Sequence, residues 1–181
     1  MQAYNSSLQD SEAFSELFTR TQIAIFRFIF GLHGGPIQDV EDLTCETFLR
    51  AWKGRRGFSG DEHDAICWLF TIARHLVIDA HRRKKSHSED ETERLDDATL
   101  DALFQSIQQT PEDLAASREQ FKQLWNLLHG LPPDRREMLV LRYMLGWQVR
   151  QIAGYLCMED NTVSVYIRRS LEKIRRDWPT E

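Results

Sequence analysis

The sequence predicts an all-α protein, built from two small helical domains joined by an acidic, flexible linker. Apolar residues recur at helical spacing through much of the chain, and no window shows the sustained alternation that marks a strand. The charge is also unevenly distributed. Residues 86–114 hold nine acidic and one basic residue, whereas residues 1–85 are neutral and residues 115–181 carry a net charge of +3.

The first domain is expected over residues 10–85, with a helix at 10–32 and another at 39–53. Asp10 or Ser11 suits the cap of the first helix, and the Gly-Gly-Pro run at 34–36 ends it. A loop at residues 54–63 holds Arg55, Arg56 and Phe58. The predicted apolar face of the first helix consists of Phe14, Leu17, Phe18, Ile25, Phe26 and Ile29.

The third helix of this domain, residues 68–85, combines an aromatic start, an apolar stripe and four consecutive cations at its end. Leu69, Ala73, Leu76 and Ala80 share one face of this helix. Aromatic, hydrogen-bonding and cationic residues lie away from that face: Trp68, Thr71, His75, Ile78 and Arg82. Such a surface suits a nucleic-acid strand. Taken alone, the pattern equally fits an ordinary amphipathic helix with solvated cations.

The linker is expected over residues 86–112, because this stretch is poor in aromatics and rich in Asp, Glu, Ser and Gln. The second domain is expected over residues 113–178. Its first helix covers about residues 114–128, and a second covers 136–145 and ends at Gly146.

A helix-turn-helix is predicted at the end of the second domain. A short helix at 149–156 is followed by a turn at 157–160 and a last helix starting near Asn161, with Asp160 or Asn161 as its cap. Residues pointing away from the apolar stripe of the last helix suit a recognition helix in a major groove. They are Asn161, Thr162, Val165, Arg168 and Arg169. The alternative is a three-helix module with a polar outer face.

Several other classes of protein are not indicated. No apolar run approaches the roughly 20 residues needed to span a bilayer, and the first residues lack the pattern of a signal peptide, so we expect a cytosolic protein. Cys45, Cys67 and Cys157 are expected as reduced thiols, with Cys157 buried at a helix end. A zinc site of Cys67 with His63 or His75 fits no common spacing. We find no catalytic residues, and we expect no cofactor and no small-molecule substrate.

Three stretches, in this order, resemble bacterial sigma-70 family factors of the extracytoplasmic-function group, which keep only the second and fourth conserved regions. The first stretch comprises residues 39–43 and 46–52. The second comprises residues 68–74, 78–79 and 82–83. The third comprises residues 131–133, 136–137, 141–143, 146, 152–153, 156 and 162–163.

This resemblance implies that the protein binds core RNA polymerase and gives it promoter specificity. Asp42, Glu46 and Leu49 share a helix face that offers two charges and an apolar anchor to a basic, partly apolar groove; the alternative is a solvated acidic face. The polymerase-binding positions implied are Asp39, Glu41, Asp42, Glu46 and Leu49.

The resemblance also implies two promoter-reading sites. The −10 element would be read as a melted strand by Phe58, Trp68, Thr71, Arg74, His75, Arg82, Arg83, Lys84 and Lys85, with Trp68 either in the core or a wedge at the edge of the bubble. The −35 element would be read as duplex by Asn161, Thr162, Ser164, Val165, Arg168 and Arg169. The resemblance further implies an anti-sigma factor as a partner. Our own hypothesis is that the acidic linker pairs with the cations at 82–85 in the free protein.

The sequence departs from the family pattern at several positions. Cys45 stands where Gln is usual, His75 where Asn is common, and Gln151 where Glu is usual. Glycine is usual at the positions of Cys157 and Asn161, and Ser and Arg are frequent at those of Val165 and Tyr166. The rival interpretation is a helix-turn-helix regulator that acts without polymerase. Such a regulator has no need of the acidic face at Asp42 and Glu46.

Overall fold

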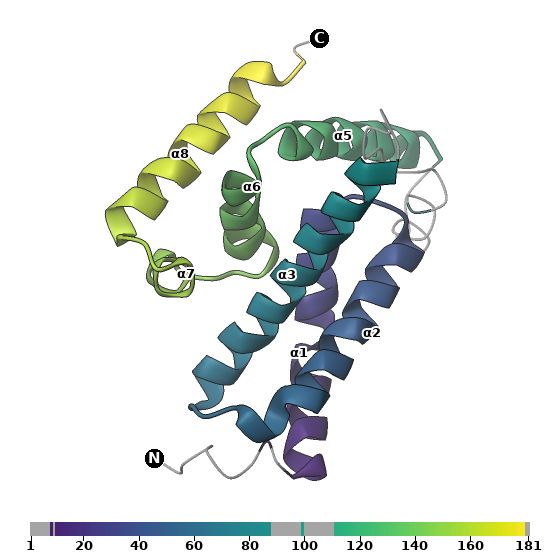
Figure 1. Cartoon of the computed structure of the whole chain (residues 1–181). Helices are drawn as coiled ribbons and strands as arrows, with labels where there is room; N and C mark the ends of the chain where they lie inside the picture. The colour runs from purple at the N-terminus through teal and green to yellow at the C-terminus, as the bar shows by residue number, and fades with distance from the viewer. Residues whose placement is uncertain (1–7, 9, 88–98, 100–110, 180–181) are drawn as a thin grey trace. The chain divides into compact units, whose positions relative to one another are not determined.

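The computed structural model describes residues 8, 10–87, 99 and 111–179, and every regular element in this part of the chain is helical (Figure 1). The chain divides into two compact units, one containing helices α1 to α3 and the other helices α5 to α8. The predicted all-α class is therefore confirmed. The predicted linker lies mostly outside the described residues, and the exact domain boundaries stay predictions. No described helix is both long and apolar enough to cross a membrane.

The first unit consists of α1 (Ser11–His33), α2 (Ile37–Gly54) and α3 (Glu62–His87), and the chain reverses direction between successive helices (Figure 1). Its core is apolar and aromatic. Phe28 of α1 meets Phe70 of α3 edge to face, with ring centroids 4.9 Å apart. Two residues of the predicted α1 face, Phe18 and Phe26, are not buried. They lie at the edge of the helix pair, where Phe18 packs on Phe48 of α2.

The third helix begins six residues earlier than the sequence predicts, because a pair of aspartates caps it. The Asp64 N–H donates to Asp61 Oδ1 at 2.9 Å, and the Asp61 N–H donates to Asp64 Oδ2 at 3.0 Å. This reciprocal arrangement satisfies two backbone donors in the first turn. The loop between α2 and α3 is consequently shorter than expected, and Phe58 lies close to the helix start.

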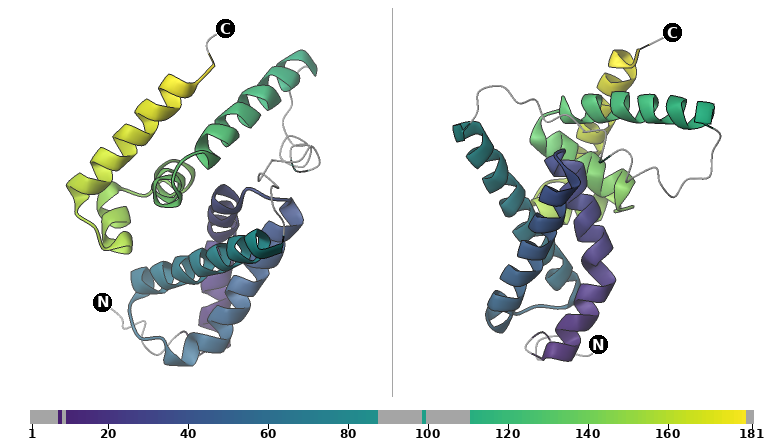
Figure 2. Two further views of the ribbon diagram at one scale, coloured as in Figure 1. Left: turned by 45° about the horizontal axis from the view of Figure 1, so that its top comes forward. Right: turned by 90° about the vertical axis from the view of Figure 1, so that its right-hand side faces the viewer.

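The second unit consists of α5 (Pro111–His129), α6 (Pro133–Leu139), a π-helical turn (Val140–Met144, η3), α7 (Val149–Leu156) and α8 (Asp160–Asp177). Helix α8 packs against α5, α6 and α7, and Figure 2 shows α7 and α8 joined by a short turn. The predicted helix at 136–145 is thus a short α-helix followed by a π turn. Tyr143, within this π turn, is 60% exposed.

The turn of the helix-turn-helix contains an unusual residue. Cys157 ends α7 in the left-handed conformation, with φ 54° and ψ 46°. The Met158 N–H donates to the Ala153 carbonyl at 2.9 Å, a bond of the Schellman type. Cys157 is exposed, so the expected burial of its thiol is wrong. The predicted cap of α8 is also wrong, because Glu159 is the N-cap and makes no side-chain capping bond.

Candidate functional site

The outer face of α2 exposes an apolar anchor beside carboxylates. Leu49 is 52% exposed, and Asp42 is exposed on the same side of the helix. Glu46 lies between them and accepts a hydrogen bond of 2.8 Å from Arg50 Nε. The opposite side of α2 is buried in the core. The spacing therefore places three of the predicted polymerase-binding residues together on one accessible surface.

Glu41 faces a different feature, an apolar groove between α1 and α2 with a volume of about 340 Å³. Cys45 also lines this groove. Ile23 of α1 is 62% exposed at the same place. The sequence analysis did not include Ile23 in any site. The sequence does hold a signal for this residue, because Ile23 is a large apolar side chain outside the predicted apolar face of the first helix.

Asp39 lies one turn before Asp42 on α2 and is already bonded to other residues of this unit. Its Oδ2 lies 3.0 Å from Lys84 Nζ and 3.4 Å from Nε2 of His33. Although burial by itself raises the pKa of Asp39, hydrogen bonds from Lys84 and His33 bring that pKa below its ordinary value. Asp39, predicted to bind polymerase, thus meets Lys84, predicted to bind DNA.

His33 was not identified from the sequence. It is 1% exposed at the end of α1, and burial lowers its pKa, an effect that the bond to Asp39 only partly offsets. The ring of His81 lies 5.4 Å from it, centroid to centroid. Together with Asp39, Arg83 and Lys84, His33 lines a cavity of about 250 Å³. Burial therefore favours the neutral form of this imidazole, which lies at the junction between α2 and the end of α3.

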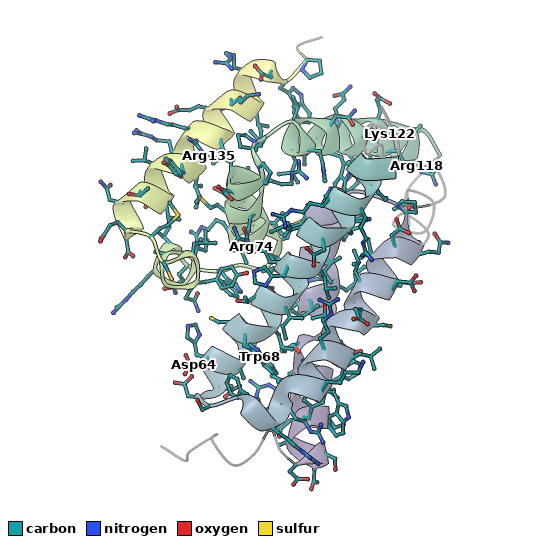
Figure 3. The ribbon with its side chains drawn as sticks, viewed as in Figure 1. Asp64, Trp68, Arg74, Arg118, Lys122 and Arg135 are labelled. Atoms are coloured by element: carbon teal, nitrogen blue, oxygen red, sulfur yellow. The ribbon has the colours of Figure 1, made fainter. Side chains whose placement is uncertain are left out.

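The two aromatic residues predicted for the −10 site are stacked on each other. The ring centroids of Phe58 and Trp68 are 5.1 Å apart with an interplanar angle of 30°. Gly54 permits this arrangement, since a Cβ there would lie 3.3 Å from Trp68. Trp68 is half-buried, and Figure 3 shows it near the start of α3. Neighbouring Arg55 is held in the loop by its bond to the Trp52 carbonyl at 2.6 Å.

Thr71, His75 and Arg82 follow Trp68 at helical spacing and share its side of α3. His75 and Arg82 are exposed, and the Thr71 hydroxyl donates to the Cys67 carbonyl at 2.8 Å. Arg74 is half-buried outside this series (Figure 3). Arg83 and Lys84 are exposed, whereas the side chain of Lys85 lies outside the described part of the chain.

The thiol considered for a zinc site lies beside one of the two histidines considered with it. Cys67 Sγ lies 3.7 Å from His63 Nε2. Burial raises the pKa of Cys67, and Asp64 and Asp61 raise it further. These effects favour the protonated thiol over the thiolate that binds metal. Among the described residues, no group of three His, Cys, Asp or Glu side chains could hold a metal ion.

The predicted recognition helix presents its polar side to solvent. Val163, Ile167 and Ser170 of α8 are buried. Of the predicted −35 residues, Thr162 and Val165 are half-buried, and the others are exposed, namely Asn161, Ser164, Arg168 and Arg169. Arg168 Nε lies 3.8 Å from Glu172. At the start of α7, the Gln151 side chain accepts a bond of 2.8 Å from the Gln148 N–H, so the residue that replaces a usual Glu still caps the helix.

Comparison with known proteins identifies the family. The family model for sigma-70 region 2 matches residues 17–87, and that for sigma-70 region 4 matches residues 121–174. The chain is 27% identical over 172 residues to the ECF RNA polymerase sigma factor BldN of Streptomyces coelicolor, covering 95% of this chain and 62% of BldN. It thus spans less than two thirds of that relative. It is 26% identical over 165 residues to the ECF RNA polymerase sigma factor SigX of Bacillus subtilis, covering 91% of this chain and 83% of SigX.

A solved structure shares the fold. It is the sigma factor RpoE in complex with the anti-sigma factor NepR from Bartonella quintana, with a TM-score of 0.66, 18% identity, and coverage of 92% of this chain and 96% of that chain. The matched family models and the curated relatives are sigma factors, which are not enzymes but act with RNA polymerase at promoter DNA. With one family model matching each helical unit and curated relatives along nearly the whole sequence, the chain belongs to the extracytoplasmic-function group of sigma-70 family RNA polymerase sigma factors, which direct transcription initiation.

Proposed function

We propose that this sigma factor docks on core RNA polymerase through the outer face of α2. In the same proposal, the loop before α3 and α3 itself read the melted −10 element, and α8 reads the −35 element as duplex. The observation that carries the polymerase contact is the exposed Leu49 beside Asp42 and Glu46. A solvent-exposed leucine within an acidic surface is matched by a partner with an apolar pocket and a basic rim.

The charges and the leucine have different roles in this contact. The carboxylates of Asp42 and Glu46 steer the partner and set its orientation, whereas burial of Leu49 supplies the apolar contribution to affinity. The bond between Glu46 and Arg50 is solvent-exposed, so exchanging it for a bond to polymerase costs little. Glu41 and Asp39 flank this surface, and we assign them a secondary part.

For the −10 element, we propose that one unpaired base stacks on the joined rings of Phe58 and Trp68. Because the two rings are already in contact, the base stacks on the outside of the pair and does not insert between them. Extrusion of a base costs a few kcal/mol, and stacking on an aromatic ring returns about 1–3 kcal/mol. Thr71 and His75 then offer hydrogen bonds, and the cations at 82–85 contact the strand backbone, with Arg74 at the edge of the site.

For the −35 element, we propose that the N-terminal half of α8 enters the major groove. Asn161, Thr162, Ser164 and Val165 then lie nearest the base edges. Arg168 and Arg169 contact phosphates, which position the helix without specifying sequence. We further propose that an anti-sigma factor binds this chain, as NepR binds RpoE in the Bartonella complex, and that the protein acts in the cytoplasm with RNA polymerase.

Binding of the purified full chain to bacterial core RNA polymerase tests the proposal. The variant Asp42→Arg/Glu46→Arg reverses both charges beside Leu49, and we expect it to lose tight binding. The matched control is Glu12→Arg/Glu16→Arg, which makes the same charge change at the same spacing on exposed positions of α1. Wild-type protein that binds duplex DNA without binding core polymerase would contradict the proposal and favour a stand-alone regulator.

A further inference from the structure

We infer that Arg135, on the first turn of α6, is an additional phosphate contact of the −35 interface, held in position by the ring of Tyr166 on α8. The interface then spans two helices, with Arg135 beside the flank of α8 that carries Tyr166 and Arg169. This inference rests on the proposed binding of the −35 duplex by α8 and extends it to a residue outside the recognition helix.

The guanidinium of Arg135 is stacked on an aromatic ring. Its Cζ lies 4.0 Å from the centroid of the Tyr166 ring, and Figure 3 shows Arg135 reaching from α6 toward α8. Both residues are half-buried. A cation–π contact of this kind restrains the flat face of the guanidinium while its N–H donors remain directed outward from the edge.

The backbone that carries Arg135 is fixed. Its N–H donates to the Pro132 carbonyl at 2.9 Å. The next residue, Arg136, is buried and donates from Nη2 to the His129 carbonyl at 2.7 Å, which ties the start of α6 to the end of α5. Arg135 therefore projects from an anchored turn and is restrained at both ends of its side chain, so that binding costs little further conformational entropy.

The donors of Arg135 are not used elsewhere in the described part of the chain. No ion pair or hydrogen bond joins its guanidinium to any described residue, although several other cations of this unit have carboxylate partners. Arg168 faces Glu172 at 3.8 Å, and Lys173 bonds Asp177 at 3.2 Å. A stacked guanidinium with unpaired donors is suited to bidentate binding of a phosphate.

The position of Arg135 matches one strand of a duplex in contact with α8. Thr162, Tyr166 and Arg169 follow one another at i, i+4 and i+7, so they share one side of the helix. Arg168 lies two residues from Tyr166 and on the other side. Because a helix in the major groove has a sugar-phosphate backbone along each flank, Arg135 and Arg169 face the same backbone. The geometry thus assigns Arg135 to positioning of the duplex and not to the reading of bases.

The test uses holoenzyme made from the full chain and bacterial core RNA polymerase, with a promoter selected by that holoenzyme from a random-sequence library. Promoter affinity is measured between about 50 and 200 mM salt, where electrostatic contacts are strongly salt-dependent. We expect Arg135→Gln to weaken binding several-fold at the lower salt and to reduce the salt slope by about 1. The loss of promoter affinity of Arg135→Gln relative to wild type is then about 3.5-fold smaller at the higher salt than at the lower.

Three variants separate a DNA contact from a purely structural role. Tyr166→Phe keeps the ring and should behave as wild type, whereas Tyr166→Leu should reproduce the reduced slope of Arg135→Gln. Arg27→Gln removes one exposed arginine from α1 and should leave the slope unchanged. If Arg135→Gln keeps the wild-type salt slope, even with reduced thermal stability, the inference is wrong while the proposed function stands. Failure of the wild-type holoenzyme to select any promoter would contradict the proposed function, and the inference with it.

Discussion

Replacing Cys157 by glycine should stabilise the helix-turn-helix. Cys157 is the one residue other than glycine with positive φ in the described part of the chain, and it terminates α7 at φ 54°. In this region the Cβ atom crowds the following carbonyl oxygen, a cost that glycine avoids. The thiol is exposed, so its removal sacrifices little packing.

The size of the effect follows from two opposing contributions. The left-handed conformation costs an L-residue about 1–2 kcal/mol. Glycine also increases the conformational entropy of the unfolded chain, which lowers the free energy of unfolding by about 0.4–1 kcal/mol. The expected net gain for Cys157→Gly is therefore about 0.5–1 kcal/mol. In a unit of this size, such a gain raises the Tm by about 2–8 °C.

The gain should be measured by thermal unfolding together with amide hydrogen exchange of peptides from α7 and α8. Exchange in these helices should slow by about 2–5-fold wherever opening of the unit limits it. Cys157→Ser is the matched control, because serine has the same backbone requirement and should lie within about 0.5 kcal/mol of wild type. If Cys157→Gly is no more stable than Cys157→Ser, the left-handed turn is not strained and the reasoning is wrong.

Three further predictions concern the proposed sites and the buried histidine. Phe58→Ala should lower transcription from a selected promoter about ten-fold or more, while Phe58→Tyr retains it, because only the alanine removes the stacking surface; equal activity of the two variants would exclude base stacking on this ring. Arg169→Ala should lower activity several-fold in the same assay, and unchanged activity would remove Arg169 from the −35 site. Burial lowers the pKa of His33 from 6.5, so below that pH the unfolded state binds a proton more readily than the folded state does. The free energy of unfolding should therefore fall as the pH drops below 6.5. Urea unfolding at about pH 7.5 and 5.5 should show this loss in wild type and a smaller loss in His33→Phe, whereas the lowered pKa of Asp39 acts only near or below 3.8.

The positions of α1 and α2 could be predicted to within two residues, because apolar periodicity and the Gly-Gly-Pro run are local signals. The start of α3 could not, since its cap is made by Asp61 and Asp64, which precede the apolar stripe. The π turn at Val140–Met144 also has no periodic signature, because it changes which carbonyl each N–H meets without changing the residues that are apolar. Sequence periodicity therefore predicts helix bodies better than helix ends.

The same distinction applies to the candidate sites. Asp42, Glu46 and Leu49 could be grouped from the sequence, because residues four and three apart on a helix share a face. The contact between Asp39 and Lys84 joins residues 45 positions apart, and the stack of Arg135 on Tyr166 joins α6 to α8. These contacts depend on how helices pack, which no local pattern encodes. Consequently the residues that share one helix face could be predicted from the sequence. The contacts between helices that bind or orient those residues could not.

The bond between Asp39 and Lys84 limits how strongly polymerase binding and DNA binding influence each other through this junction. Lys84 is 49% exposed and Asp39 is 42% exposed, so their ion pair contributes at most about 1 kcal/mol. If polymerase binds Asp39, the ion pair breaks and the Lys84 ammonium becomes available to a DNA phosphate. By thermodynamic reciprocity, DNA that binds Lys84 makes Asp39 available to polymerase, with the same gain in binding free energy. An energy of that size corresponds to about a five-fold change in affinity. His33 offsets little of the lost charge, because burial lowers its pKa and so disfavours its charged form. Any larger dependence of promoter binding on polymerase must therefore arise outside this ion pair.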